Sequence, residues 1–163
     1  MKRDKRSVNS DSIPAAISFS CAFQTASSPA KGQQQKKAIA KIIECVKEVE
    51  AQALFVSWRH DTHCDHQASY RIARAARHKL SGVRLYEYTV WGSALAPTMP
   101  VGQVTDGFRL WIDRGRSKKQ RAIAAHRSQT TDMIKDDPNG FRLTESDLAR
   151  FDCPCEFFFE SAE

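Results

Sequence analysis

The chain has 163 residues, of which 41% are hydrophobic and 27% are charged, and its formal net charge is +6. These proportions fit one globular domain of ordinary size and exclude a wholly disordered chain, while no apolar run approaches the roughly 18 residues that cross a membrane. Lysine and arginine occur in every segment, which indicates solvated surface charge, so no nucleic-acid partner is expected.

The first part of the chain is polar and lacks periodicity. Residues 1–35 are rich in Ser, Gln, Lys and Ala, which predicts a poorly ordered lead-in to a folded domain over residues 36–163. The basic start is similar to a signal peptide, but Pro14 and several serines interrupt its apolar part, so we expect a cytoplasmic protein. From Lys36 to Glu50, apolar residues recur at the spacing of one helical face and predict an amphipathic helix.

A strand and a helix follow. The run Ala53–Trp58 is short and apolar on both faces, as in a strand buried within a parallel sheet. Next, Thr62-x-x-Asp65 has the form of a capping box, in which the threonine accepts backbone N–H groups at a helix start. We therefore predict a helix from Thr62 to Leu80 that stops before Gly82.

Two strands and a helix are predicted in the middle of the chain. Alternating β-branched and aromatic residues predict strands over Val83–Trp91 and Phe108–Ile112. A second capping-box pattern, Ser117-x-x-Gln120, predicts a helix that continues to about Gln129.

The last third contains a turn, a short helix and a strand. Pro138-Asn139-Gly140 predicts the turn, and Thr144 begins a short helix that includes Phe151. Glu156–Glu160 is predicted as a strand or an aromatic latch. Alternating helices and strands indicate an α/β domain with a largely parallel sheet and flanking helices, Rossmann-like in its layering.

Histidines and aspartates gather directly after the first predicted strand, where ligands bind in open α/β sheets. His60, Asp61, His63, Asp65 and His66 all fall within seven residues. His63 and His66 are three residues apart at a helix start, so their side chains emerge on one face, and the positive end of the helix dipole favours neutral imidazole. Asp65 could hold one ring by accepting its N–H. The pattern favours a metal or catalytic site; a polar loop that only caps the helix is the alternative.

The cysteines do not form a recognisable framework. They are Cys21, Cys45, Cys64, Cys153 and Cys155. Their odd number and irregular spacing indicate reduced thiols rather than disulfides or a zinc ribbon. Cys153-Pro154-Cys155 has one residue between its sulfurs, which differs from the redox Cys-x-x-Cys pattern, and we interpret it as incidental.

The segment Val56–His66 resembles the second motif of the PIG-L/LmbE-like zinc deacetylases, which runs strand, Trp, two variable residues, Asp-x-His-Pro-Asp-His and helix. Three later segments agree with that family in the same order, so the resemblance extends over about Lys36–Glu160. They are Leu85–Trp91, the Lys-x-x-Ala-x-x-x-His-x-Ser-Gln pattern of Lys119–Gln129, and Phe151–Phe158.

The resemblance implies a de-N-acetylase, in which zinc activates a water molecule that attacks the acetamide of an N-acetylglucosamine-type conjugate. It implies that His66 is a zinc ligand, and that His63, with Asp65 behind it, stabilises the oxyanion or acts as an acid. The residues implied to contact the sugar are Arg59, Asp61, Tyr88 and Trp91.

The chain departs from the family pattern in two places. Cys64 replaces the usual proline. The family's first motif, His-Pro-Asp-Asp-Glu, occurs nowhere in the 163 residues. In the family this motif supplies two zinc ligands and the general-base aspartate, so we expect these to be absent, together with the first β-α-β portion of the fold. A sheet without its first strands would expose an edge and predicts possible oligomers.

Two alternatives to an active enzyme therefore stay open. One is a catalytically inactive, truncated family member. The other is a basic protein that binds an anionic partner through helical runs of arginine and lysine. These runs are Arg71, Arg74, Arg77 and Lys79, and Lys118, Lys119 and Arg121.

Overall fold

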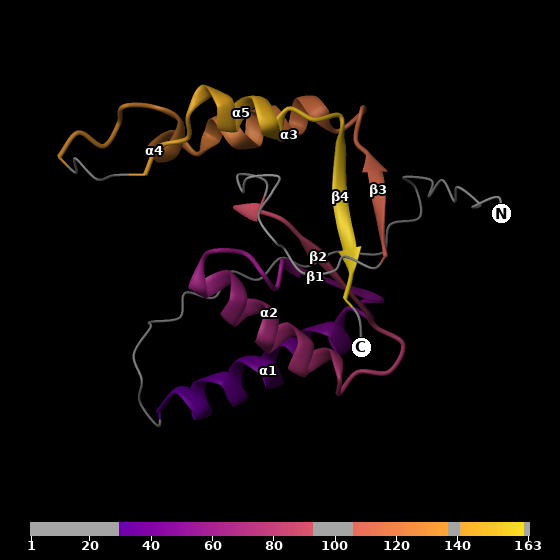
Figure 1. Cartoon of the computed structure of the whole chain (residues 1–163). Coiled ribbons are helices and arrows are strands. Elements are labelled where there is room, and N and C mark those ends of the chain that lie inside the picture. The colour runs from indigo at the N-terminus through magenta and orange to yellow at the C-terminus, as the bar shows by residue number, and fades with distance from the viewer. Residues whose placement is uncertain (1–29, 93–105, 137–140, 162–163) are drawn as a thin grey trace. The chain divides into compact units, whose positions relative to one another are not determined.

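The computed structural model describes residues 30–92, 106–136 and 141–161 (Figure 1). These residues belong to two compact units: the first comprises the chain up to Phe108 together with the segment from Phe158 onward, and the second comprises Arg109–Phe157. Within the described ranges, no helix is long and apolar enough to cross a membrane.

The first unit is built on a strand–helix–strand crossover that follows a long helix. Its elements are α1 (Ala30–Glu48), β1 (Ala53–Ser57), α2 (Cys64–Arg77) and β2 (Arg84–Tyr88). Strands β1 and β2 pair in parallel, with Ala53 opposite Arg84 and Ser57 opposite Tyr88. Parallel neighbours need a crossover connection, and α2 provides it. Both strands therefore end at the same edge, next to the start of α2.

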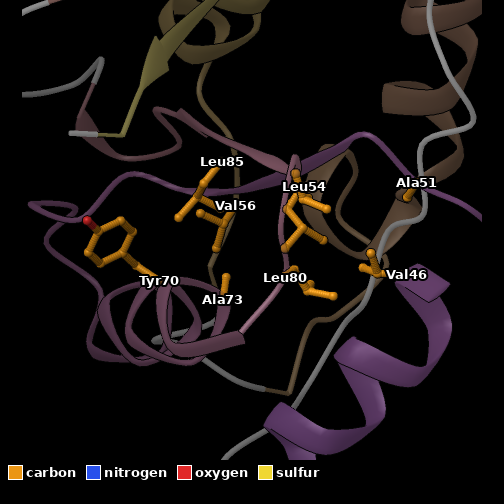
Figure 2. Close-up of a cluster of buried hydrophobic side chains, with 9 residues drawn as sticks. Val46, Ala51, Leu54, Val56, Tyr70, Ala73, Leu80 and Leu85 are labelled. Atoms are coloured by element: carbon orange, nitrogen blue, oxygen red, sulfur yellow. The ribbon is translucent and has the colours of Figure 1, made fainter. Parts of the chain in front are cut away.

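Apolar side chains from all four elements form the core of this unit. In Figure 2, Val56 and Leu85 from the sheet face Tyr70 and Ala73 from α2. Fully burying a large apolar side chain stabilises a fold by about 1.5–3 kcal/mol, so this cluster is the main source of stability for the site beside it. The cluster consists of Val46, Ala51, Leu54, Val56, Tyr70, Ala73, Leu80, Val83 and Leu85.

The four strands form one sheet in the order β1-β2-β4-β3, where β3 is Gly107–Trp111 and β4 is Cys155–Glu160. The predicted α/β class with flanking helices is confirmed, but only β1 and β2 are shown to be parallel, because β4 runs antiparallel to β2 with Tyr86 opposite Glu160. At Gly107 the chain passes so close to β4 that an added Cβ would lie 2.4 Å from the Phe158 carbonyl oxygen.

Two boundaries in the first unit differ from the sequence predictions. Helix α1 begins at Ala30, inside the segment expected to lead into the domain, whereas residues 1–29 lie outside the described ranges. The predicted cap at Thr62 is wrong: the N-cap of α2 is His63, whose Nδ1 accepts the backbone N–H of Asp65 at 3.2 Å. The helix ends at Arg77, and Gly82 follows with a φ of 76°, a left-handed conformation that favours glycine.

The second unit holds three helices. They are α3 (Arg116–Ala125), α4 (Arg127–Thr130) and α5 (Glu145–Phe151). The capping box predicted at Ser117 is wrong, because α3 begins after Gly115 without a side-chain cap, and Gln120 instead donates to Asp152 Oδ1 at 2.8 Å. The helix predicted from Thr144 is confirmed as α5. The turn predicted over residues 138–140 lies outside the described residues.

The observed cap at Thr144 and the position predicted as a cap at Ser117 can be compared directly by mutation. Thr144 Oγ1 accepts the Asp147 N–H at 3.2 Å, and Asp147 Oδ2 accepts the Thr144 N–H at 2.9 Å. We expect Thr144→Ala to lower the free energy of unfolding by about 1 kcal/mol in a urea titration. Ser117→Ala should change it by less than about 0.5 kcal/mol, because Ser117 caps no helix. Equal losses for the two variants would contradict this assignment of the caps.

Candidate functional site

The site lies in the loop that joins β1 to α2. Trp58 donates its backbone N–H to the Tyr88 carbonyl at 2.8 Å, and Asp61 donates to the Trp58 carbonyl at 3.0 Å. The loop is therefore held against the end of β2. The carboxyl ends of both parallel strands and the amino end of α2 meet here, which is where α/β sheets bind ligands.

Asp61 is the centre of this loop and is fully buried. Its Oδ1 accepts the His63 N–H at 3.1 Å, and its Oδ2 accepts the N–H groups of Trp91 at 2.9 Å and Val90 at 3.3 Å. Burial alone raises the pKa of Asp61, but the N–H groups of His63 and Trp91, together with His66, outweigh it and hold the pKa below its ordinary value. The carboxylate thus ties the start of α2 to the segment after β2.

Asp61 also sets the orientation of His66. The His66 Nδ1 lies 3.0 Å from Asp61 Oδ1, and the ring keeps 24% of its side-chain surface exposed. A carboxylate beside Nδ1 favours the tautomer with its proton on that nitrogen, which leaves a lone pair on Nε2. Nε2 of His66 is therefore suited to bind a metal ion. The sequence had suggested Asp65 as the carboxylate beside a histidine ring, and the structure places Asp61 beside the His66 ring.

His63 has the opposite arrangement. Because its Nδ1 accepts the Asp65 N–H, the neutral ring carries its proton on Nε2 and can donate a hydrogen bond there. The Asp65 carboxylate lies 3.9 Å from His63 Nδ1, beyond hydrogen-bond distance. The rings of His63 and His66 are 5.0 Å apart between centroids. One ring thus offers a donor and its neighbour offers a lone pair.

Glu87 is a buried residue that the sequence analysis did not single out. It lies on β2 opposite Val56 and has no exposed surface. Its Oε1 is 2.7 Å from Arg59 Nη2, and its Oε2 accepts the backbone N–H of Arg59 at 2.8 Å and the side-chain Nε–H at 3.1 Å. The sequence signal that could have identified Glu87 was a single acidic residue within a strand of alternating apolar and aromatic residues.

The four residues implied to contact a sugar differ in how they are placed. Asp61 has no exposed surface, so its side chain contacts the protein interior instead. Arg59 is 28% exposed in its side chain and is held by Glu87, with its guanidinium 5.5 Å from the centroid of the Tyr70 ring. Tyr88 is exposed at the end of β2, and Trp91 anchors Asp61 through its backbone N–H. Sugar contact by Arg59, Tyr88 and Trp91 stays a prediction.

Potential metal donors are present at the start of α2. Ligand atoms of His63, Cys64 and Asp65 lie within 4.8 Å of one another at the partly exposed helix start. Among the described residues, His66 belongs to no such group of three. Catalytic zinc usually has three protein ligands and an open position. His66 therefore fits the requirement for one ligand, and the described residues do not complete a three-ligand set around it.

The second unit brings together residues of the late motif. The helix predicted over Lys119–Gln129 is interrupted at His126, where α3 ends and α4 begins. A pocket of about 200 Å³ is lined by residues that include three positions of this motif, so the motif segment folds around one cavity. Its lining residues are Lys119, Ile123, His126, Gln129, Leu143 and Phe151.

Comparison with known proteins identifies related folds. No family model and no curated protein matches the sequence. Among solved structures, the zinc-inhibited form of the teicoplanin deacetylase Orf2 is similar, with a TM-score of 0.55 and 15% identity over 93% of this chain. The A40926 pseudoaglycone deacetylase Dbv21 aligns over 79% of this chain and 60% of its own, with 19% identity and a TM-score of 0.49. The chain spans 62% of the Orf2 structure, and at this identity the two share a fold.

Proposed function

We propose that this chain belongs to a metal-dependent deacetylase that removes the acetyl group from an N-acetylated amino sugar. The observation that carries the proposal is the pair His63 and His66 at the carboxyl edge of the parallel strands, where Nδ1 of His63 accepts a backbone N–H and Nδ1 of His66 lies 3.0 Å from the Asp61 carboxylate. The fold shared with the teicoplanin deacetylase and the resemblance of Val56–His66 to a deacetylase motif support it.

Each residue of the loop has a defined task in this proposal. His66 would hold the metal through Nε2, and Asp61 would orient the ring from its position beside Nδ1. Bound zinc would polarise the amide carbonyl and lower the pKa of a water molecule to about 7. His63 donates its Nε2 proton toward the oxygen that gains negative charge, and the Asp65 N–H keeps the ring in that tautomer.

Further ligands are needed to complete a catalytic metal site. In the proposal they come from residues outside the described ranges, or from a longer protein of which this chain is a part. If no such residues exist, the chain is the inactive family member considered from the sequence. Metal binding and hydrolysis are therefore measured separately.

Zinc binding to the purified chain tests the ligand assignment. We expect calorimetric titration to detect zinc binding that is lost in His66→Ala, because this change removes the ring nitrogen that the proposal assigns to the metal. His60→Ala is the matched control, since His60 lies in the same loop with its ring against Trp58, 5.3 Å between centroids, and should bind zinc as the unaltered chain does. Equal binding by unaltered protein and His66→Ala would overturn the assignment of His66.

Release of a free amine from an N-acetylglucosamine conjugate tests the reaction. We expect amine release that depends on added zinc and is lost in His66→Ala. Zinc binding at His66 without amine release would identify a metal-binding but inactive protein and would overturn the proposed activity. Zinc-independent amine release would equally contradict it, because the proposed water activation needs the metal.

A further inference from the structure

Cys153 and Cys155 lie at the junction between α5 and β4 with their sulfur atoms in contact. The two Sγ atoms are 3.2 Å apart. A disulfide has a sulfur–sulfur distance of about 2.05 Å, so a movement of about 1 Å would bring these sulfurs to bonding distance. The sequence interpretation took Cys153-Pro154-Cys155 as incidental, and the structure adds that the chain at Pro154 places the two thiols side by side.

The two thiols are not equivalent. Cys153 is half-buried, whereas Cys155 is buried with 6% of its surface exposed. Hydrogen bonds from the thiol and then the backbone N–H of Cys155 lower the pKa of Cys153. The bond to Cys153 and then burial raise the pKa of Cys155. Cys153 is thus the thiol that ionises more readily. Cys155 stays protonated to a higher pH and is less accessible to solvent.

The charged side chains near the pair form ion pairs with one another. Lys119 Nζ lies 2.6 Å from Glu156 Oε1, and its charge favours the Cys153 thiolate. Arg116 binds Asp152, the residue directly before Cys153, through two nitrogens. The guanidinium of Arg109 lies 5.4 Å from the centroid of the Phe157 ring. The carboxylate of Glu156 raises the pKa of Cys153 in opposition to Lys119, so charges of both signs lie near the pair.

We propose that Cys153 and Cys155 form a thiol–disulfide exchange site for small organic disulfides, represented by glutathione disulfide. The Cys153 thiolate attacks one sulfur of the organic disulfide, forms a mixed disulfide and releases one thiolate. Cys155 then loses its proton to solvent and attacks the Cys153 sulfur, which releases the second thiolate and closes the Cys153–Cys155 bond. Two electrons pass from the cysteine pair to the organic disulfide, which becomes two thiols.

Mass spectrometry of the full chain treated with glutathione disulfide tests this site. The experiment uses a background in which Cys21, Cys45 and Cys64 are replaced by serine, so that only the pair can react. We expect the pair to lose two hydrogen atoms and to retain no glutathione. Cys155→Ser in this background should trap glutathione on Cys153. Cys153→Ser should acquire glutathione on Cys155 about tenfold more slowly, because that thiol is buried and less ionised.

Repeating the reaction in concentrated urea separates the folded geometry from the local sequence. In urea the two single variants should react at similar rates, because the difference in burial between the two positions is lost. Equal rates in the folded state would overturn the assigned roles of the two thiols. Stable glutathione adducts on the intact pair, or disulfides only between chains, would overturn the exchange site itself.

Discussion

Replacing Arg59 by alanine is expected to lower the free energy of unfolding by about 3 kcal/mol, because Glu87 would keep a buried charge without its partner. Glu87 has no exposed surface, and Arg59 supplies both nitrogens that contact it from a side chain. The Arg59 side chain is 28% exposed, which places the expected loss at the lower end of the range for buried pairs, about 3–5 kcal/mol. Urea unfolding followed by circular dichroism measures it.

Two further variants make that measurement specific. Arg71→Ala removes an exposed arginine of α2 and should cost less than about 0.5 kcal/mol. The double variant Arg59→Met with Glu87→Leu removes both charges, and it should be more stable than Arg59→Ala because no unpaired charge stays buried. If Arg59→Ala were as stable as the unaltered protein, the ion pair would not hold the loop against β2.

Asp61→Asn is expected to weaken zinc binding by about 10–100-fold, the usual effect of removing the group that orients a ligating histidine. The same change should lower the free energy of unfolding by about 1–3 kcal/mol. Both carboxylate oxygens of Asp61 accept backbone N–H groups, from His63 on one side and Trp91 on the other. An asparagine has one accepting oxygen, so its NH₂ group must face a buried N–H on the other side. Calorimetry and urea unfolding measure the two effects.

Asp65→Asn is the matched control for Asp61→Asn. The Asp65 side chain is 39% exposed and lies 3.9 Å from His63 Nδ1, and the contact that orients His63 comes from the Asp65 backbone. Its replacement should therefore cost no more than about 0.5 kcal/mol, mainly through the helix dipole. A larger loss of zinc affinity in Asp65→Asn than in Asp61→Asn would reverse the roles that the structure indicates for the two aspartates.

The sequence predicted the existence of the elements well, because periodicity reports which faces are buried. Val56 in the apolar run and Leu80 at the end of the predicted helix both belong to the core cluster. Strand direction leaves no such trace in a sequence. The antiparallel pairing of Glu87 with Phe159 could therefore not be read from either strand alone. It depends on the path of a chain segment between them.

The sequence located the candidate site but did not predict the contacts that its residues make. The cluster of histidines after a buried strand indicated the right loop. Capping preferences favoured Thr62, yet Asp61 accepts the His63 N–H, and His63 takes the N-cap position itself. Glu87 was missed because alternation along a strand suggests a solvent-facing acid, whereas its partner Arg59 lies 28 residues earlier and became a neighbour only through the crossover.

The pairing of β4 with β2 has a consequence for the order of events during protein synthesis. Tyr86 pairs with Glu160, so one edge of β2 acquires its partner strand β4 only after about seventy more residues have been translated. Until that segment leaves the ribosome, β1, α2 and β2 can assemble, but the second edge of β2 exposes unpaired backbone groups. A nascent chain of this protein would therefore be most prone to association with other chains before β4 emerges, and this is the interval in which a chaperone would protect it.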